Sequence, residues 1–149
     1  MANAMNKVSI ISPYGGSLVD LVADPDKAAE LKEKANHLPS IQMSERIVCD
    51  LELLATGGFS PLDRFMGKED HQRVLDEMRL TSGHLFPIPI TLPIDPTVEL
   101  KLDSQIAIRN SKNEILAIMD VEEIYEWDRA VVAAKAFGTT DTTHPLVAE

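Results

Sequence analysis

Cysteine is nearly absent from this sequence, whose 149 residues include only Cys49. A single thiol cannot form an internal disulfide, which excludes a small disulfide-stapled secreted domain and fits a reducing compartment. No histidine or aspartate arrangement near Cys49 suggests a nucleophile. We therefore expect this residue to be a small buried side chain within a helix.

Long hydrophobic runs are missing as well. Nowhere are 18 consecutive residues apolar, and the start of the sequence lacks the apolar segment of a secretory signal. The sequence therefore predicts a cytoplasmic protein with no membrane partner. We interpret residues 1–7 as a disordered start, in which Met5 is the natural first residue if residues 1–4 are left over from cloning.

Basic residues are few, because 14 Lys and Arg stand against 24 Asp and Glu, for a net charge of −10. This charge repels a phosphate backbone, so we expect no nucleic-acid partner. The acidic residues are spread out as on a solvated surface and lack the spacing of a cation-binding loop. Gly67-Lys68 is followed by Glu69, where a phosphate-binding loop needs Ser or Thr.

The rest of the composition is that of a soluble globular protein, with 44% apolar and 26% charged residues. A chain of this length commonly forms one domain. We place that domain at residues 8–141 and interpret the polar, proline-containing residues 142–149 as a linker. Helical patterns dominate the first half and alternating patterns the second, which predicts an α+β fold.

Apolar periodicity and end signals predict four helices. They begin after the N-caps Asp24 and Ser44, near Glu69, and at Ala130, and they end before Pro39, at Gly57, near Leu80 and at Gly138. Ser60-Pro61 is predicted to restart a helix directly after the Gly57-Gly58 stop. His71 lies on a partly apolar helix face, and we interpret it as a structural histidine.

Alternation of apolar and polar residues predicts the strands. The predicted strands are Val8–Ile11, Phe86–Asp95, Val98–Leu102, the segment around Ile106 and Ile108, and Glu114–Val121. Three prolines make Phe86–Asp95 an edge strand, and Val121–Trp127 fits either a helix or a strand end. Short strands joined by polar turns predict a small mixed or antiparallel β-barrel with flanking helices.

The stretch from Arg46 to Met66 combines a helix, a glycine stop and a new N-cap within 21 residues. We predict that it is a structural helix corner whose carboxylates and serine serve as caps and salt links. Its motif residues are Arg46, Asp50, Glu52, Gly57, Ser60, Pro61 and Phe65. No catalytic, cofactor-binding or metal-ligating residue is predicted in the chain.

Four motifs follow one another in an order typical of a known family. They are Pro13-x-Gly15-Gly16-x-Leu18, Arg46-x-x-x-Asp50-Leu51-Glu52-x-Leu54-x-x-Gly57-x-x-Ser60-Pro61-Leu62-x-x-Phe65-Met66, Phe86-Pro87-Ile88-Pro89-Ile90 and Gly138-Thr139-Thr140-Asp141-x-x-His144-Pro145. Together they resemble the N-terminal PUA-like domain of ATP sulfurylase (sulfate adenylyltransferase). The sequence departs from the family at Tyr14, where His is frequent, and at Arg64, where Gly is frequent.

The resemblance implies a non-catalytic domain of a larger enzyme. ATP sulfurylases convert Mg·ATP and sulfate to adenosine 5′-phosphosulfate and pyrophosphate, and their downstream catalytic domain carries Gln-x-Arg-Asn and His-x-x-His motifs. Neither motif occurs in this sequence. The implied partners are the C-terminal catalytic domain of the same enzyme and further copies in a homo-oligomer. The resemblance implies that the whole enzyme requires Mg·ATP and that this domain binds no cofactor. The alternative is a stand-alone PUA-like module that binds RNA or protein.

Overall fold

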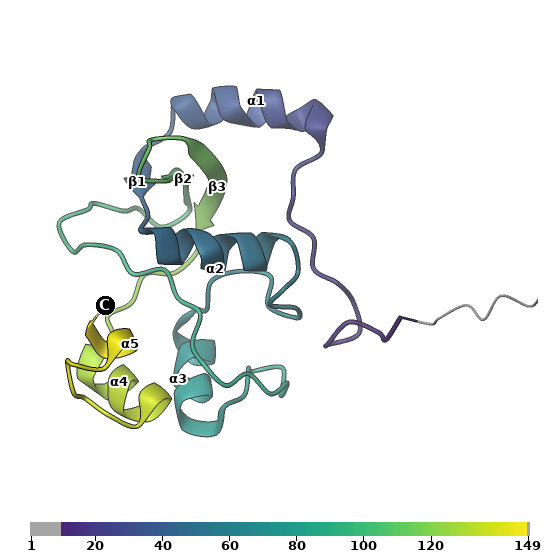
Figure 1. Cartoon of the computed structure of the whole chain (residues 1–149). Coiled ribbons are helices and arrows are strands. Elements are labelled where there is room, and N and C mark those ends of the chain that lie inside the picture. Colours follow the sequence, from purple (N-terminus) through teal and green to yellow (C-terminus); the bar gives the residue numbers. More distant parts are fainter. Residues whose placement is uncertain (1–9, 149) are drawn as a thin grey trace, which may run out of the picture.

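The computed structural model describes residues 10–148 of the chain, which form helices and short strands (Figure 1). In chain order the elements are α1 (Pro25–Asn36), β1 (Ser40–Gln42), α2 (Glu45–Ala55), α3 (Lys68–Glu77), β2 (Ser104–Arg109), β3 (Ile115–Val121), α4 (Arg129–Phe137) and α5 (Pro145–Ala148). The fold is therefore α+β, as predicted. The expected strand Val8–Ile11 lies mostly outside the described residues, and its last two residues form no strand.

The three strands form one mixed sheet in the order β1-β2-β3. β1 pairs parallel to β2 with Ile41 opposite Ile108, and β2 pairs antiparallel to β3 with Ile106 opposite Met119. In Figure 1 the sheet lies between α1 and α2. The sheet of residues 10–148 is open at β1 and β3, so the mixed pairing agrees with the sequence, whereas the predicted closure into a barrel is not found.

Two predicted strands are absent, which leaves the sheet small. Phe86–Asp95 has an irregular backbone, and the isolated bridge between Leu85 and Arg79 lies directly before it. Its three prolines cannot donate hydrogen bonds to a neighbouring strand, so alternation alone does not make it a strand. Val98–Leu102 begins in a local turn, in which the amide of Val98 donates to the carbonyl of Asp95 over 2.9 Å.

The buried side chains form two clusters. The sheet cluster consists of Ile41, Met43, Ile106, Ile108 and Val121, and three side chains of α2 pack against it: Ile47, Val48 and Leu51. The second cluster consists of Leu54, Leu62, Met66, Val74, Leu80, Phe86 and Ile90. The segment 86–95 contributes to both clusters, because Leu92 and Ile94 pack against the sheet cluster. This segment thus joins the two parts of the core without being a strand.

Most of the predicted helix ends agree with the structure, because they depend on local caps. The Ser44 hydroxyl accepts a hydrogen bond from the amide of Ile47, and Gly138 ends α4 with a φ of 70°. The third predicted helix is shorter than expected, since α3 ends where Met78 adopts a left-handed conformation. Cys49 is exposed, so the expectation of a buried thiol was wrong; it lies on the side of α2 that faces away from the sheet cluster.

The Ser60-Pro61 helix restart was also wrong. Residues 56–61 form turns, and no helix begins before Lys68. We call residues 56–67 the elbow, because they join the end of α2 to the start of α3. Residues 10–23, which we call the strap, run without helix or strand past the end of α2 before α1 begins (Figure 1). The elbow is where the strap, two helices and the segment after β3 meet.

Candidate functional site

Gly57 is a point at which the backbone of the strap lies very close to the elbow. Its φ is +85°, a left-handed conformation that allows the chain to leave α2. A Cβ atom at this position would collide with the backbone oxygen of Val19 and would lie 2.7 Å from Cδ1 of Leu18. Glycine is therefore required here for two reasons, its conformation and the close approach of a second backbone.

Ser60 connects the same two segments through its hydroxyl. The hydroxyl donates to the carbonyl of Gly57 over 2.8 Å and accepts from the amide of Val19 over 2.9 Å. The strap is held further along by the amide of Leu21, which donates to the carbonyl of Ala55 over 2.8 Å. Ser60 is buried. Its hydroxyl thus satisfies backbone groups of two segments and does not cap a helix, which corrects the sequence interpretation.

Replacing Ser60 by alanine is expected to lower the free energy of unfolding by about 2 kcal/mol, because the strap amide of Val19 loses its partner and the Gly57 carbonyl keeps only the backbone amide of residue 60. Ser104→Ala is a matched control, since the Ser104 hydroxyl also donates to a carbonyl three residues earlier, that of Lys101, but at an exposed position. Urea unfolding of both variants measures the difference. An equal loss in the two variants would mean that the bridge to the strap contributes nothing.

The seven motif residues named from the sequence divide between the elbow and α2. Gly57, Ser60, Pro61 and Phe65 lie in the elbow, where Pro61 faces Gly15 of the strap and Phe65 packs against the second core cluster. Arg46, Asp50 and Glu52 lie on α2, with Arg46 and Glu52 exposed. Burial raises the pKa of Asp50, and the positive charge of Arg46 partly offsets this effect. The elbow half of the motif is therefore the part that makes tertiary contacts with the strap.

The segment 122–128, which follows β3, packs along the elbow and the start of α3. Arg64 of the elbow forms ion pairs with Asp63 and with Glu122. The Glu123 carboxylate accepts from the amide of Lys68 at 3.1 Å, at the first turn of α3. The Arg64 residue that departs from the resembled family thus contributes a polar link between two distant segments. Both Arg64 and Glu122 are largely exposed, so the link itself stabilises the fold by less than about 1 kcal/mol.

Tyr125 provides the buried part of this contact. Its hydroxyl donates to the carbonyl of Met66 over 2.8 Å. Burial, together with the nearby Glu123 carboxylate, raises the pKa of Tyr125 to about 12, so the hydroxyl keeps its proton at neutral pH. Sequence reasoning did not single out Tyr125, although two aromatic residues, Tyr125 and Trp127, within a segment of undecided structure were a signal that it packs against something.

His71 of α3 lies under these two aromatic residues. Its ring centroid is 5.6 Å from that of Tyr125 and 6.2 Å from that of Trp127. The residue is only 6% exposed, as expected for a structural histidine. Burial lowers the pKa of His71 because the charged imidazolium loses hydration.

This lowered pKa predicts a loss of stability in mild acid. Below the ordinary histidine pKa of 6.5, the unfolded chain binds a proton more readily than the folded chain, so the free energy of unfolding falls as the pH drops. The slope contributed by one such group is at most about 1.4 kcal/mol per pH unit. Urea unfolding at pH 7.5 and pH 5.5 should show that His71→Phe loses less stability between these two pH values than the unmodified chain. Identical pH dependence in the two proteins would contradict this assignment.

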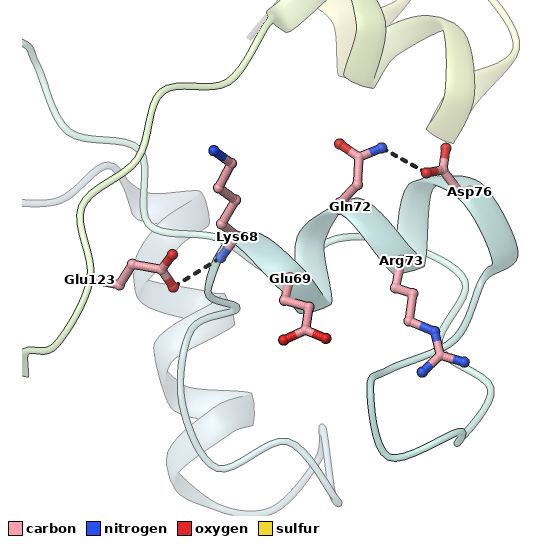
Figure 2. Close-up of a pocket in the computed structure, with 6 residues that line it drawn as sticks. All are labelled: Lys68, Glu69, Gln72, Arg73, Asp76 and Glu123. Atoms are coloured by element: carbon pink, nitrogen blue, oxygen red, sulfur yellow. Dashed lines mark hydrogen bonds between the residues drawn. The ribbon is translucent and has the colours of Figure 1, made fainter.

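A shallow polar pocket of about 490 Å³ runs along α3. Figure 2 shows its six lining residues: Lys68, Glu69, Gln72, Arg73, Asp76 and Glu123. Lys68 and Gln72 project to one side of the helix, and Glu69 and Arg73 project to the other (Figure 2). Four of the six side chains are already paired: Gln72 donates to Asp76 over 2.7 Å, Arg73 donates to Glu77 over 3.2 Å, and the Glu123 carboxylate accepts from the amide of Lys68. The side chains do not converge on a common point, which is unlike a substrate site.

A larger groove of about 1490 Å³ separates the elbow from the sheet. Apolar side chains of both core clusters line its floor, among them Leu54 and Ile108. The carboxylates that line it are Asp63, Glu69, Asp70, Asp95, Asp120, Glu122, Glu123 and Glu126, and Arg64 is the one basic side chain in the lining. This charge repels phosphate groups, so the groove is unsuited to a nucleotide.

Within residues 10–148, no group of three or more His, Cys, Asp or Glu side chains is arranged to hold a metal ion. None of the helices in the same range is both long and apolar enough to cross a membrane.

Comparison with known proteins places this architecture in a class of small α+β domains. A family model described as "PUA-like domain" matches residues 11–149, which includes the strap, the elbow and the sheet. The chain therefore belongs to the family of PUA-like domains.

Similar proteins are sulfate adenylyltransferases. The chain is 41% identical over 139 residues to the sulfate adenylyltransferase of Synechococcus sp. (strain JA-3-3Ab), covering 92% of this chain and 35% of that protein. It is 46% identical over 142 residues to the sulfate adenylyltransferase of Chaetomium globosum, covering 91% of this chain and 25% of that protein. The chain thus spans between a quarter and about a third of the length of these relatives.

A solved structure resembles the same fold. It is titled "Hexameric APS kinase from Thiobacillus denitrificans" and aligns with a TM-score of 0.71 at 36% sequence identity. The alignment covers 79% of this chain and 24% of that chain. The structural likeness, like the sequence likeness, concerns one portion of a much longer protein.

Proposed function

We propose that this chain is the non-catalytic PUA-like domain of a sulfate adenylyltransferase, the enzyme that makes adenosine 5′-phosphosulfate and pyrophosphate from ATP and sulfate. The observation that carries the proposal is the identity of 41% over 92% of the chain to an enzyme of that name. In this proposal residues 8–141 form the domain and residues 142–149 lead to a C-terminal catalytic domain. The motif residues of the elbow hold the domain together and take no part in the chemistry.

The charge of the molecule supports a non-catalytic role. Transfer of an adenylyl group needs cations and amide donors that stabilise the charge developing on a phosphate. The large groove of this domain is lined instead by carboxylates. Mg·ATP and sulfate would therefore be bound by the remainder of the enzyme, which acts in the cytoplasm, and no cofactor is bound in this domain.

Assembly into oligomers is part of the same proposal. The structurally similar protein from Thiobacillus denitrificans is described as hexameric, and it contains a portion with this fold. The domain would support both the catalytic domain and contacts between copies of the enzyme.

The proposal is tested by transplanting the chain. Residues 10–148 replace the matching segment of the Synechococcus sulfate adenylyltransferase, and sulfate-dependent release of pyrophosphate from Mg·ATP is measured. We expect activity in this chimera and none above the blank with the isolated chain. The same enzyme with its matching segment deleted is the control, and we expect it to be unstable or inactive.

An inactive chimera beside an active parent enzyme would contradict the proposal. Activity of the isolated chain would contradict it too. The alternative, a stand-alone module that binds RNA or protein, predicts a salt-sensitive gel shift with RNA or a coding sequence that stops directly after Glu149.

A further inference from the structure

The strap exposes an unusual concentration of apolar side chains. Ile11 is 89% exposed, Leu18 and Val22 are each 60% exposed, and Leu21 is 50% exposed. Asp20 is the only charged residue between positions 10 and 23, although 26% of the whole chain is charged. Exposed apolar patches of this kind mark surfaces that bind another protein surface.

The backbone of the strap is held in place, so these side chains are not those of a loose tail. The amide of Gly16 closes a turn by donating to the carbonyl of Pro13 over 3.0 Å. Further along, the amides of Val19 and Leu21 donate to the elbow and to the end of α2. The apolar side chains therefore point outward from a fixed backbone. Because the fold already fixes this backbone, binding to a second surface costs little further conformational entropy.

The patch continues from the strap onto α2. Leu18 lies against Gly57, and Leu53 of α2 lies against the neighbouring Gly58, with its Cδ2 atom 2.8 Å from the position of an added Cβ. Leu53 is itself 44% exposed. We call the exposed side chains of Ile11, Leu18, Leu21, Val22 and Leu53 the strap face. It combines two segments that are far apart in the sequence.

The relatives are much longer than this chain, which bears on what could cover the strap face. The strap lies within the matched PUA-like family region, which begins at residue 11, so it is part of the domain and not an appended tail. The relatives place this domain in chains of which it forms 25% to 35%. We propose that the strap face docks against the remaining part of such a longer sulfate adenylyltransferase chain, an inference that rests on the proposed function.

Hydrogen exchange tests this docking in the Synechococcus chimera described above. The amides of residues 10–23 should exchange at least about tenfold more slowly in the chimera than in the isolated chain, because docking removes them from local opening. Val22→Asp should abolish this gain in protection, while leaving exchange in the isolated chain unchanged. Leu102→Asp is the matched control, since Leu102 is 57% exposed but lies outside the strap face, and it should keep the gain.

Several outcomes would overturn the docking proposal. Equal exchange in the chimera and the isolated chain would show that nothing covers the strap face. A loss of protection in the isolated Val22→Asp chain would show that the side chain has a role within the domain. Sedimentation showing a dimer of the isolated chain that Val22→Asp dissociates would assign the face to a second copy. The proposed function is tested separately, by the release of pyrophosphate from the unsubstituted chimera. An active chimera without slower exchange would contradict the docking alone, whereas an inactive chimera would contradict the proposed function.

Discussion

Gly57→Ala is expected to reduce the free energy of unfolding by about 3 kcal/mol or more. Alanine would have to adopt a φ of +85°, and its Cβ would collide with the backbone oxygen of Val19. The collision can be relieved only by moving the strap or the end of α2, which breaks the hydrogen bonds of Val19 and Leu21. Urea unfolding, followed by circular dichroism, measures the loss.

Gly83→Ala separates the collision from the conformational strain. Gly83 has a φ of +88°, close to that of Gly57, but an added Cβ would meet nothing within 4 Å. This variant should lose only the cost of a left-handed alanine, about 1 kcal/mol. Equal losses of unfolding free energy in both variants would show that the close approach of the strap to Gly57 contributes nothing to stability, and would contradict the placement of this contact.

Ile108→Ala is expected to lower the free energy of unfolding by about 3 kcal/mol, because it removes three carbon atoms from the centre of the sheet cluster. Ile108 lies on β2, the central strand, and only 1% of the residue is exposed. It pairs with Ile41 of β1 and with Ala117 of β3, so the cavity would border both neighbouring strands. With only three strands, the sheet has few other contacts that could close the cavity.

The matched control for this change is Ile124→Ala. It removes the same atoms from a side chain that is 52% exposed, in the segment after β3. A loss below about 1 kcal/mol is expected there. A similar loss in both variants would show that the open sheet is not a tightly packed core, and that the second cluster around the elbow carries most of the stability.

Local features were predictable because they depend on neighbours within one or two turns. The N-cap at Ser44 and the helix stop at Gly138 are examples, since each depends on the backbone of its own segment. Alternation also predicted β2 and β3 correctly as strands, although Ala107 between Ile106 and Ile108 is buried as well. The same alternation failed for Phe86–Asp95, where Phe86 and Ile90 are buried but Ile88 is 41% exposed, and the prolines leave too few donors for pairing.

The candidate site shows most clearly which features could not be predicted from the sequence. The sequence singled out Gly57 and Ser60 as important, and both lie at the centre of the elbow. Their physical roles could not be predicted, because the partner of each is Val19, about 40 positions earlier. Likewise, the contact of Tyr125 with Met66 joins residues 59 positions apart, and no local pattern specifies such a pair.

Composition and short-range pattern alone determined the α+β class, the acidic charge, most of the helix ends and the resemblance to a PUA-like domain. These properties follow from residue chemistry and from hydrogen bonds within a single segment. Tertiary structure alone decided that the sheet stays open, that Cys49 is exposed and that Ser60 bridges to the strap. It also decided that the strap presents its apolar side chains outward, because that outcome depends on which distant segments supply hydrogen-bond partners and buried surface.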